Sequence, residues 1–174
     1  MSSISLTPTQ QTILAHADIV GVAALAQLVN VIGPIRAEPG QPAWRQTTFF
    51  PFAAAARTAG HTVHRTAPRN PGGTEQPVNV TVTSHAEDGV IHVLLSNTSQ
   101  TETAEVTVDL AGLAPAAVRS ASLLWDADAH ATNSAGDPTR VAPAPLAAHL
   151  DDGRLCTSLP AISWADIVLT TAQA

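Results

Sequence analysis

Lysine is absent from this chain of 174 residues, and its eight basic residues are arginines spread along the sequence. Proteins that bind nucleic acid gather basic side chains on one face to neutralise phosphates. The scattered arginines and the net charge of −6 therefore argue against a nucleic-acid partner. Aromatic residues make up only 3% of the chain, which predicts a lightly packed core of small aliphatic side chains.

Cysteine occurs once, at Cys156, so an internal disulfide is excluded. A single cysteine in a strand-like segment is typical of a small core residue, and we assign it no chemistry. No run of 18 apolar residues is free of polar ones, and Met1 to Ser3 lack the charged and apolar regions of a secretory signal. We therefore expect a cytoplasmic protein with no membrane partner.

The seven histidines do not show the spacing of metal ligands. His61 and His64 lie three residues apart, but no cysteine or acidic residue completes a set around them, and we expect them to be surface residues that flank a strand. Several aspartates lack the 12-residue calcium loop with its closing glutamate and are typical of turns: Asp126, Asp128, Asp137, Asp151 and Asp152. We expect no metal and no cofactor.

The first 30 residues predict one helix. Thr7 suits the capping position, Pro8 suits the first turn, and apolar residues from Ile13 to Leu28 recur at steps of three and four. Small residues between positions 21 and 26 suit a helix packed against a sheet, and equally well reflect an alanine bias. The pattern closes between Gln27 and Asn30.

Residues 31–35, VIGPI, are apolar on both faces of a pleated strand, as in a parallel strand covered on both sides. A loop rich in proline and glycine follows over 36–45, and a second helix is then expected, capped by Thr47 or Thr48 and ended by Gly60. Helix, strand, loop and helix form the repeat of parallel α/β folds, in which functional residues lie on the loops after the strands. No other strand of this type occurs in the chain, so its neighbours must come from elsewhere.

After Gly60 the apolar pattern alternates. Residues 78–82 and 91–95 alternate across a turn near Asp88-Gly89, which predicts a hairpin. Trp125 and Trp164 are candidates for stacking on sugar rings, but their apolar context also fits a core or an interface. Further short strands at regular spacing predict a β-sandwich, with expected ranges 61–66, 106–110, 121–125, 146–150, 154–158 and 167–170.

Four segments in this order carry a family resemblance: HAD at 16–18, LAQLVNVIGPI at 25–35, AWRQTTFFPF at 43–52 and ATNSAGDPTRV at 131–141. Together they resemble the C-terminal part of α-L-arabinofuranosidases of glycoside hydrolase family 51. The resemblance implies a (β/α)8 barrel joined to a C-terminal β-sandwich, and release of terminal arabinofuranosyl groups with retention by two glutamates. We therefore expect an α/β fragment, the last helix-strand-helix of a TIM-type barrel, over residues 1–60. An all-β, jelly-roll-like sandwich is expected over 61–174.

The family's catalytic glutamates belong to barrel strands that precede the residues of this chain, so the resemblance assigns no catalytic residue here. Retaining hydrolysis needs two carboxyl groups about 5 Å apart, and only Glu38 lies on the loop after the expected strand. We interpret Glu38 as a partner of Arg36 or Arg45. Gln46 matches a family residue of the arabinose pocket, and its amide both donates to and accepts from hydroxyls. Trp44 beside it either walls this substrate-binding pocket or plugs the top of the barrel.

Two functions follow from these observations. The first is the C-terminal part of an arabinofuranosidase of L-arabinose metabolism, inactive alone, with an upstream barrel segment or a homo-oligomer as partner and an arabinofuranosyl oligosaccharide as substrate of the assembled enzyme. The second is a non-catalytic β-sandwich that binds glycans or serves as a structural subunit. A binding module has no use for a helix, a buried strand and a pocket loop, which favours the first function.

Overall fold

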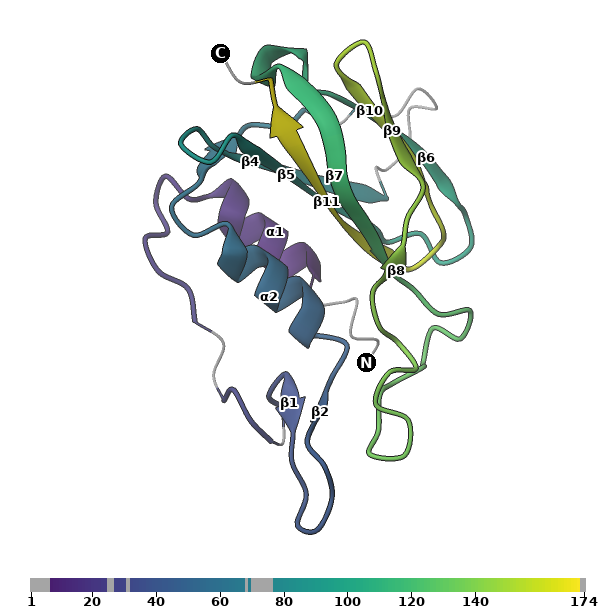
Figure 1. The fold of residues 1–174 in the computed structure, drawn as a ribbon. Helices are drawn as coiled ribbons and strands as arrows, with labels where there is room; N and C mark the ends of the chain where they lie inside the picture. Colours follow the sequence, from purple (N-terminus) through teal and green to yellow (C-terminus); the bar gives the residue numbers. More distant parts are fainter. Residues whose placement is uncertain (1–6, 25–26, 31, 68, 70–76, 173–174) are drawn as a thin grey trace.

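The computed structural model describes residues 7–24, 27–30, 32–67, 69 and 77–172. It is mostly β-sheet with two α-helices, an arrangement consistent with a β-sandwich. A six-stranded sheet lies between a three-stranded sheet on one face and the two helices on the other (Figure 1).

The six-stranded sheet has the order β3-β4-β5-β11-β7-β8, and all neighbouring strands in it are antiparallel. Strand β11, which follows every other described strand in the chain, lies in the middle of this sheet between β5 and β7. The strands are β3 (Thr62–His64), β4 (Val78–His85), β5 (Val90–Asn97), β7 (Pro115–Leu124), β8 (Ala144–Pro145) and β11 (Ser163–Thr171).

The three-stranded sheet has the order β6-β10-β9, from strands β6 (Ala104–Asp109), β10 (Arg154–Leu159) and β9 (Ala148–Asp151). Strands β9 and β10 are joined by a tight turn in which Asp152 and Gly153 both have positive φ, of 46° and 73°. The short 3-10 helix η2 (Ala111–Leu113) follows β6. Side chains from alternate positions of both sheets fill the space between them, with the fully buried residues Ile91, Val93, Leu95, Leu155, Leu159, Ala165, Ile167 and Leu169.

Helices α1 (Thr7–Ala15) and α2 (Phe49–Arg57) cover the other face of the large sheet. Ala54 of α2 is fully buried in a second apolar cluster with Leu94, Leu124 and Trp164 of the sheet. Gln11 ties α1 to β5, because its side chain donates to the main-chain oxygen of Leu94 at 2.8 Å and accepts from the Ser96 hydroxyl at 2.7 Å. Trp164 is buried in this cluster, between the large sheet and the helices of residues 1–60, rather than in the core between the two sheets.

The strands expected after Gly60 are confirmed. The hairpin of β4 and β5 turns at Gly89, which has a φ of 59°, and the pair β9 and β10 turns at Asp152-Gly153 as the sequence predicts. Strand β7 is longer than expected, since it begins at Pro115. The second helix is also confirmed, although Thr48 makes no side-chain capping bond and the helix ends at Arg57, three residues before Gly60.

The predicted first helix is too long. Helix α1 ends at Ala15 rather than near Asn30, and Leu28 of the expected buried stripe is 58% exposed. Leu25 and Ala26 of the same prediction lie outside the described residues. A helix in a protein is stabilised mainly by burying its apolar face, and beyond Ala15 the stripe meets no described element that buries it.

The predicted parallel strand over 31–35 is also wrong. Val31 lies outside the described residues, Ile32 is 70% exposed, and Ile35 belongs to strand β1 (Ile35–Arg36). Strand β1 pairs antiparallel with β2 (Trp44–Arg45), and an isolated parallel bridge joins Val29 to Ile35. Because no second strand of the parallel type is described, the backbone groups of this segment pair locally in a short hairpin.

Candidate functional site

The hairpin of β1 and β2 carries both residues that the sequence singles out for binding. Gln46 follows β2 directly, and its main-chain N–H donates to the Pro34 oxygen at 2.8 Å. Its side-chain Nε2 donates to the Gly33 oxygen at 2.7 Å. The amide is therefore fixed in orientation, with its carbonyl oxygen as the end left to accept a bond from another group.

Gly33 is required for the close turn beneath Gln46. A Cβ at Gly33 would lie 2.8 Å from the main-chain oxygen of Gln27, closer than real Cβ atoms approach backbone. Only glycine lets the chain pass there, so the position of the Gln46 amide depends on Gly33.

Trp44 is 8% exposed, and its indole Nε1 donates to the main-chain oxygen of Asn133 at 3.1 Å. Asn133 is itself buried, and its side chain donates to the main-chain oxygens of Arg45 and Val141 at 2.9 and 3.0 Å. The Asn133 Oδ1 accepts from the Val141 N–H at 2.8 Å. The hairpin is thus held against the loop 131–141, and the sequence alone gave no signal for this contact between distant segments.

Glu38 lies in the loop that connects β1 to β2, and its side chain is 50% exposed. It pairs with Arg36 at 3.5 Å, as the sequence predicts, and residues 33–47 contain no other acidic residue. The hairpin therefore lacks the pair of carboxyl groups that retaining hydrolysis needs. The guanidinium of Arg45 instead lies over the Phe49 ring, at 4.7 Å from its centroid.

Asp126 and Asp128 serve as turn formers. Each accepts a bond from the main-chain N–H two residues later, at 2.8 and 2.9 Å. Arg140 pairs with both carboxylates, at 3.5 and 3.3 Å. These contacts confirm the prediction that both aspartates form turns, and both carboxylates are also paired with Arg140.

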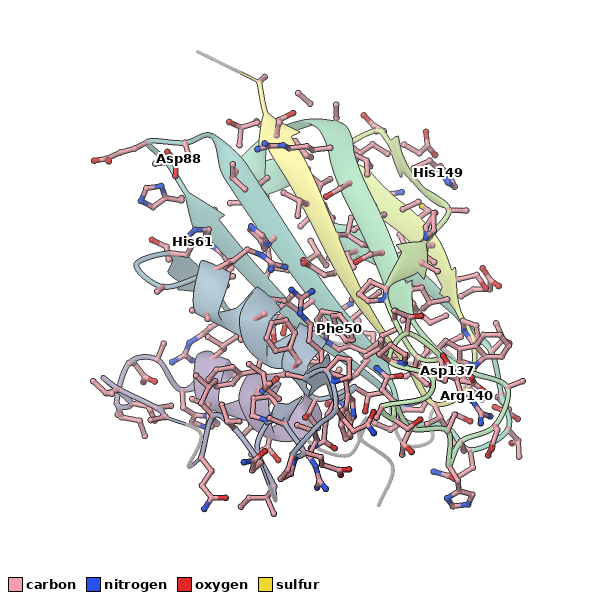
Figure 2. All side chains as sticks on the ribbon, turned by 60° about the horizontal axis from the view of Figure 1, so that its bottom comes forward. Phe50, His61, Asp88, Asp137, Arg140 and His149 are labelled. Atoms are coloured by element: carbon pink, nitrogen blue, oxygen red, sulfur yellow. The ribbon has the colours of Figure 1, made fainter. Side chains whose placement is uncertain are left out.

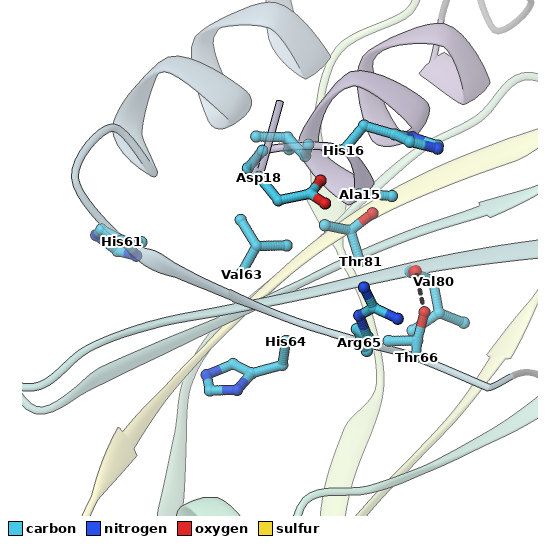
Figure 3. A pocket seen from close by; sticks show the side chains of 12 residues that line it. Ala15, His16, Asp18, His61, Val63, His64, Arg65, Thr66, Val80 and Thr81 are labelled. Atoms are coloured by element: carbon cyan, nitrogen blue, oxygen red, sulfur yellow. Dashed lines mark hydrogen bonds between the residues drawn. The ribbon is translucent and has the colours of Figure 1, made fainter. Parts of the chain in front are cut away.

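A polar hollow of about 590 Å³ lies between the end of α1 and strand β3 (Figure 3). Asp18 and Arg65 carry its charges, and both are labelled in the close-up. Thr66 at its edge donates to the main-chain oxygen of Val80 at 3.1 Å. The hollow offers hydrogen bonds but one carboxylate and no Trp, Tyr or Phe ring among its lining residues, so it has neither a catalytic pair nor a sugar-stacking surface.

The histidines are more closely grouped than the sequence predicts. His61 directly precedes β3, whereas His64 is the last residue of that strand, and both are half-buried rather than at the surface as expected. The His61 ring stacks on His85 with centroids 5.2 Å apart. His92 is buried and contacts His61 edge to face at 5.5 Å. Among the described residues no group of three or more His, Cys, Asp or Glu has the geometry to hold a metal ion. His92 lies between the core residues Ile91 and Val93 of β5, and no sequence motif indicated its neighbours.

Trp125 differs from Trp164 in being 42% exposed, with its indole N–H donating to the Ala161 oxygen at 3.1 Å. It is the exposed one of the three tryptophans, since Trp44 and Trp164 are buried. In the described part of the chain, both α-helices have nine residues, and neither is long and apolar enough to cross a membrane.

Comparison with known proteins gives a consistent result. The family model of the α-L-arabinofuranosidase C-terminal domain matches residues 9–163. An intracellular exo-α-(1→5)-L-arabinofuranosidase of Streptomyces lividans is 42% identical over 162 residues, which are 89% of this chain and 24% of that protein. An exo-α-(1→6)-L-arabinofuranosidase of Bifidobacterium longum is 41% identical over 165 residues, 88% of this chain and 31% of the relative.

Solved structures agree with the sequence relatives. A family 51 α-L-arabinofuranosidase of Bifidobacterium longum superposes with a TM-score of 0.86 at 36% identity, over 96% of this chain and 34% of that structure. An arabinofuranosidase of Xanthomonas axonopodis superposes with a TM-score of 0.82 at 22% identity, which supports the fold alone. The chain thus spans about a quarter to a third of the length of the proteins it matches.

Proposed function

Because the chain belongs to the family of α-L-arabinofuranosidase C-terminal domains, we propose that it is the C-terminal portion of an enzyme that hydrolyses terminal arabinofuranosyl groups with retention. The observation that carries this proposal is the match over residues 9–163 together with the small share of each relative that the chain spans. The remaining length of such relatives is where a catalytic barrel would lie.

We propose that residues 1–60 are the C-terminal fragment of that barrel. Apolar side chains of this part lie uncovered, with Ile19, Val22 and Ile32 exposed by 78%, 89% and 70%. An apolar groove of about 360 Å³ also runs between α1 and α2. Surfaces of this kind are typical of a contact that a further segment buries. An upstream barrel segment would cover these residues, with a homo-oligomer as the alternative partner.

In the assembled enzyme this chain supplies substrate-binding groups and no catalytic residue. Two carboxyl groups about 5 Å apart would come from the barrel segment, one attacking the sugar and one protonating the leaving oxygen. Gln46 would bind a hydroxyl of the arabinofuranosyl group through its carbonyl oxygen, while one N–H of its Nε2 donates to the Gly33 oxygen and holds the amide in place. Trp44 would hold the hairpin against the loop 131–141 through its hydrogen bond to Asn133.

We further propose a cytoplasmic location, since the names of several relatives describe intracellular enzymes. Residues 61–174 form the sandwich unit of the proposed division, and residues 1–60 the barrel unit. Limited proteolysis tests this division: a β-rich core that outlasts the helical part supports it, and survival of the helical part alone contradicts it.

The activity is tested by assaying the purified chain on an aryl α-L-arabinofuranoside, alone and with the barrel portion of a relative supplied in trans. We expect no turnover by the chain alone, because removing a member of a catalytic set costs several orders of magnitude in rate. Turnover is expected when the barrel portion is added. Authentic turnover by the chain alone, checked by mass for contaminating enzyme, would make a carboxylate of this chain catalytic, with Glu38 the first to test.

A second function is favoured by the exposed ring of Trp125. A non-catalytic β-sandwich would bind an arabinofuranosyl oligosaccharide by stacking a sugar on this ring. Titration of the oligosaccharide against tryptophan fluorescence separates the two functions, because Trp125→Ala abolishes the signal only if this surface is the binding site.

A further inference from the structure

The large sheet carries a second hollow, of about 420 Å³, on its helix-covered face just beyond the end of α2. Two arginines, Arg57 and Arg119, line it together with His61, His92 and the hydroxyl-bearing Ser120. Figure 2 shows His61 just beyond α2 and Asp88 at the nearby turn of β4 and β5. The groups come from five different parts of the fold, so only the folded chain brings them together.

Both carboxylates near this hollow are already engaged. The Asp166 side chain is 7% exposed and accepts from Arg57 Nη2 at 2.8 Å. Its other oxygen lies 3.4 Å from His92 Nδ1. Asp88, at the rim, contacts His85 Nδ1 at 2.8 Å. Each carboxylate therefore contacts a basic side chain of the cluster, which reduces its repulsion of a bound anion.

The arginines retain hydrogen-bonding capacity. The Arg57 side chain is 57% exposed and uses one terminal nitrogen on Asp166, which leaves further N–H donors. Arg119 is exposed on β7 and makes no ion pair among the described residues. Guanidinium groups bind oxyanions through two parallel N–H bonds, and two such groups at one hollow suit a ligand of that shape.

His61 makes the site sensitive to pH. Burial lowers the pKa of His61, and the nearby His92 and His85 lower it further, against an opposing effect of Asp88. His61 is therefore mostly neutral at neutral pH, and the two arginines balance the two aspartates. A bound anion would favour the protonated imidazole and would bind more tightly as pH falls. The charged and titratable groups that face His61 across the cluster are Arg57, His85, Asp88, His92, Arg119 and Asp166.

We propose that this hollow binds a small molecule carrying an oxyanion, with Arg57 and Arg119 as its charged partners and the Ser120 hydroxyl as a further donor. The hollow of about 420 Å³ has room for more than a bare ion, which is compatible with an oxyanion carried on a molecule of sugar size. Phosphate esters and sugar carboxylates share this chemistry. The inference is independent of the activity proposed above, since none of these groups belongs to the hairpin site.

Sulfate is the first probe, because its charge stays constant between pH 5.5 and 8. We expect a titration of the full chain, followed by imidazole resonances at matched ionic strength, to shift His61 and His92 and to be tighter at the lower pH. Arg119→Gln should weaken binding by about three- to fivefold, the effect of one partly exposed charge pair. Arg154→Gln removes the same charge from an exposed position at the start of β10, in the other sheet, and should leave the affinity unchanged.

A hexose phosphate and a hexuronate then distinguish the two ligand sources, and tighter binding of either than of sulfate supports the proposal. Three results would overturn it: no saturable shift with any of the three anions, equal losses in Arg119→Gln and Arg154→Gln, or an affinity for sulfate that does not change with pH. Each variant is checked for an unchanged melting temperature, and Arg119→Lys, which keeps the charge, should restore part of the affinity.

Discussion

The indole nitrogen of Trp44 donates to the main-chain oxygen of Asn133 at 3.1 Å, and the Asn133 side chain in turn donates to the main-chain oxygen of Arg45 at 2.9 Å. Two segments separated by 89 positions are thereby held by reciprocal hydrogen bonds. Both segments belong to the sequence stretches that resemble the arabinofuranosidase family. Their contact places the Gln46 loop against the sandwich.

Trp44→Phe should lower the free energy of unfolding by about 1–2 kcal/mol, because the buried Asn133 oxygen loses a donor that water cannot easily replace. Trp125→Phe is the matched control: it removes an indole N–H bond of the same 3.1 Å length, but from a residue that is 42% exposed. Urea denaturation of both variants measures the difference. Equal losses would show that burial of the Trp44 bond contributes nothing.

Gly153→Ala should destabilise the chain by about 1–2 kcal/mol, because a side chain at positive φ is strained. The residue has a φ of 73°, and an added Cβ would also lie 3.1 Å from the Ala111 Cα. Gly136→Ala is the control, since a Cβ there meets nothing within 4 Å and no positive φ is involved. Thermal melts should separate the two variants, and equal melting temperatures would contradict the role given to the turn.

The free energy of unfolding should fall as pH drops through 6.5. Burial and the neighbouring imidazoles lower the folded-state pKa of His61 below its ordinary value of 6.5, so below that pH the unfolded chain binds more protons than the folded one. The stability associated with neutral His61 is therefore fully present above 6.5 and is lost on acidification.

Denaturation of the wild-type chain and of His61→Gln at several pH values between 8 and 5 tests this. The glutamine variant should show a flatter dependence over that range. His149→Gln, at an exposed position on β9, is the control and should keep the slope of the wild-type chain. A wild-type slope in His61→Gln would assign the acid sensitivity to other groups.

Gln46→Ala should lower kcat/KM of the assembled enzyme on an aryl α-L-arabinofuranoside. One neutral hydrogen bond is worth on the order of 1 kcal/mol, or about fivefold, and more if a buried hydroxyl is left unpaired. The structure gives Gln46 a second role, because its Nε2 holds Gly33 at 2.7 Å. Gln46→Glu separates the roles: it keeps an acceptor for the sugar but loses the donor to Gly33. Unchanged kinetics in Gln46→Ala would remove the residue from the binding site.

The sequence predicted the parts of the fold that short-range patterns determine. Alternation over residues 78–95 predicted the β4–β5 hairpin, and turn residues such as Asp152 and Gly153 predicted where strands reverse. The alanine-rich run after Thr48 predicted α2. Each of these elements has its packing partner within the described chain, so the local preference and the final structure agree.

The segment from Ala17 to Ile35 could not be predicted in the same way. Its apolar residues indicate burial, yet in this chain Ile32 is exposed and the backbone turns at Gly33. The contact of Trp44 with Asn133 depends on how the hairpin meets a distant loop, which no periodicity reveals. The cluster of His61, His92 and Asp166 was missed for the same reason, because only the fold brings the segment before β3 together with strands β5 and β11.

The place of β11 in the large sheet has a consequence for synthesis of the protein. Residues 163–171 pair with β5 on one side and β7 on the other, although both partners are made earlier. During translation the two halves of the sheet emerge from the ribosome as separate hairpin-like pieces with unpaired edges, and only the last strand joins them. Folding is therefore completed after translation of these residues, and a nascent chain stalled before Ser163 would present open strand edges to chaperones.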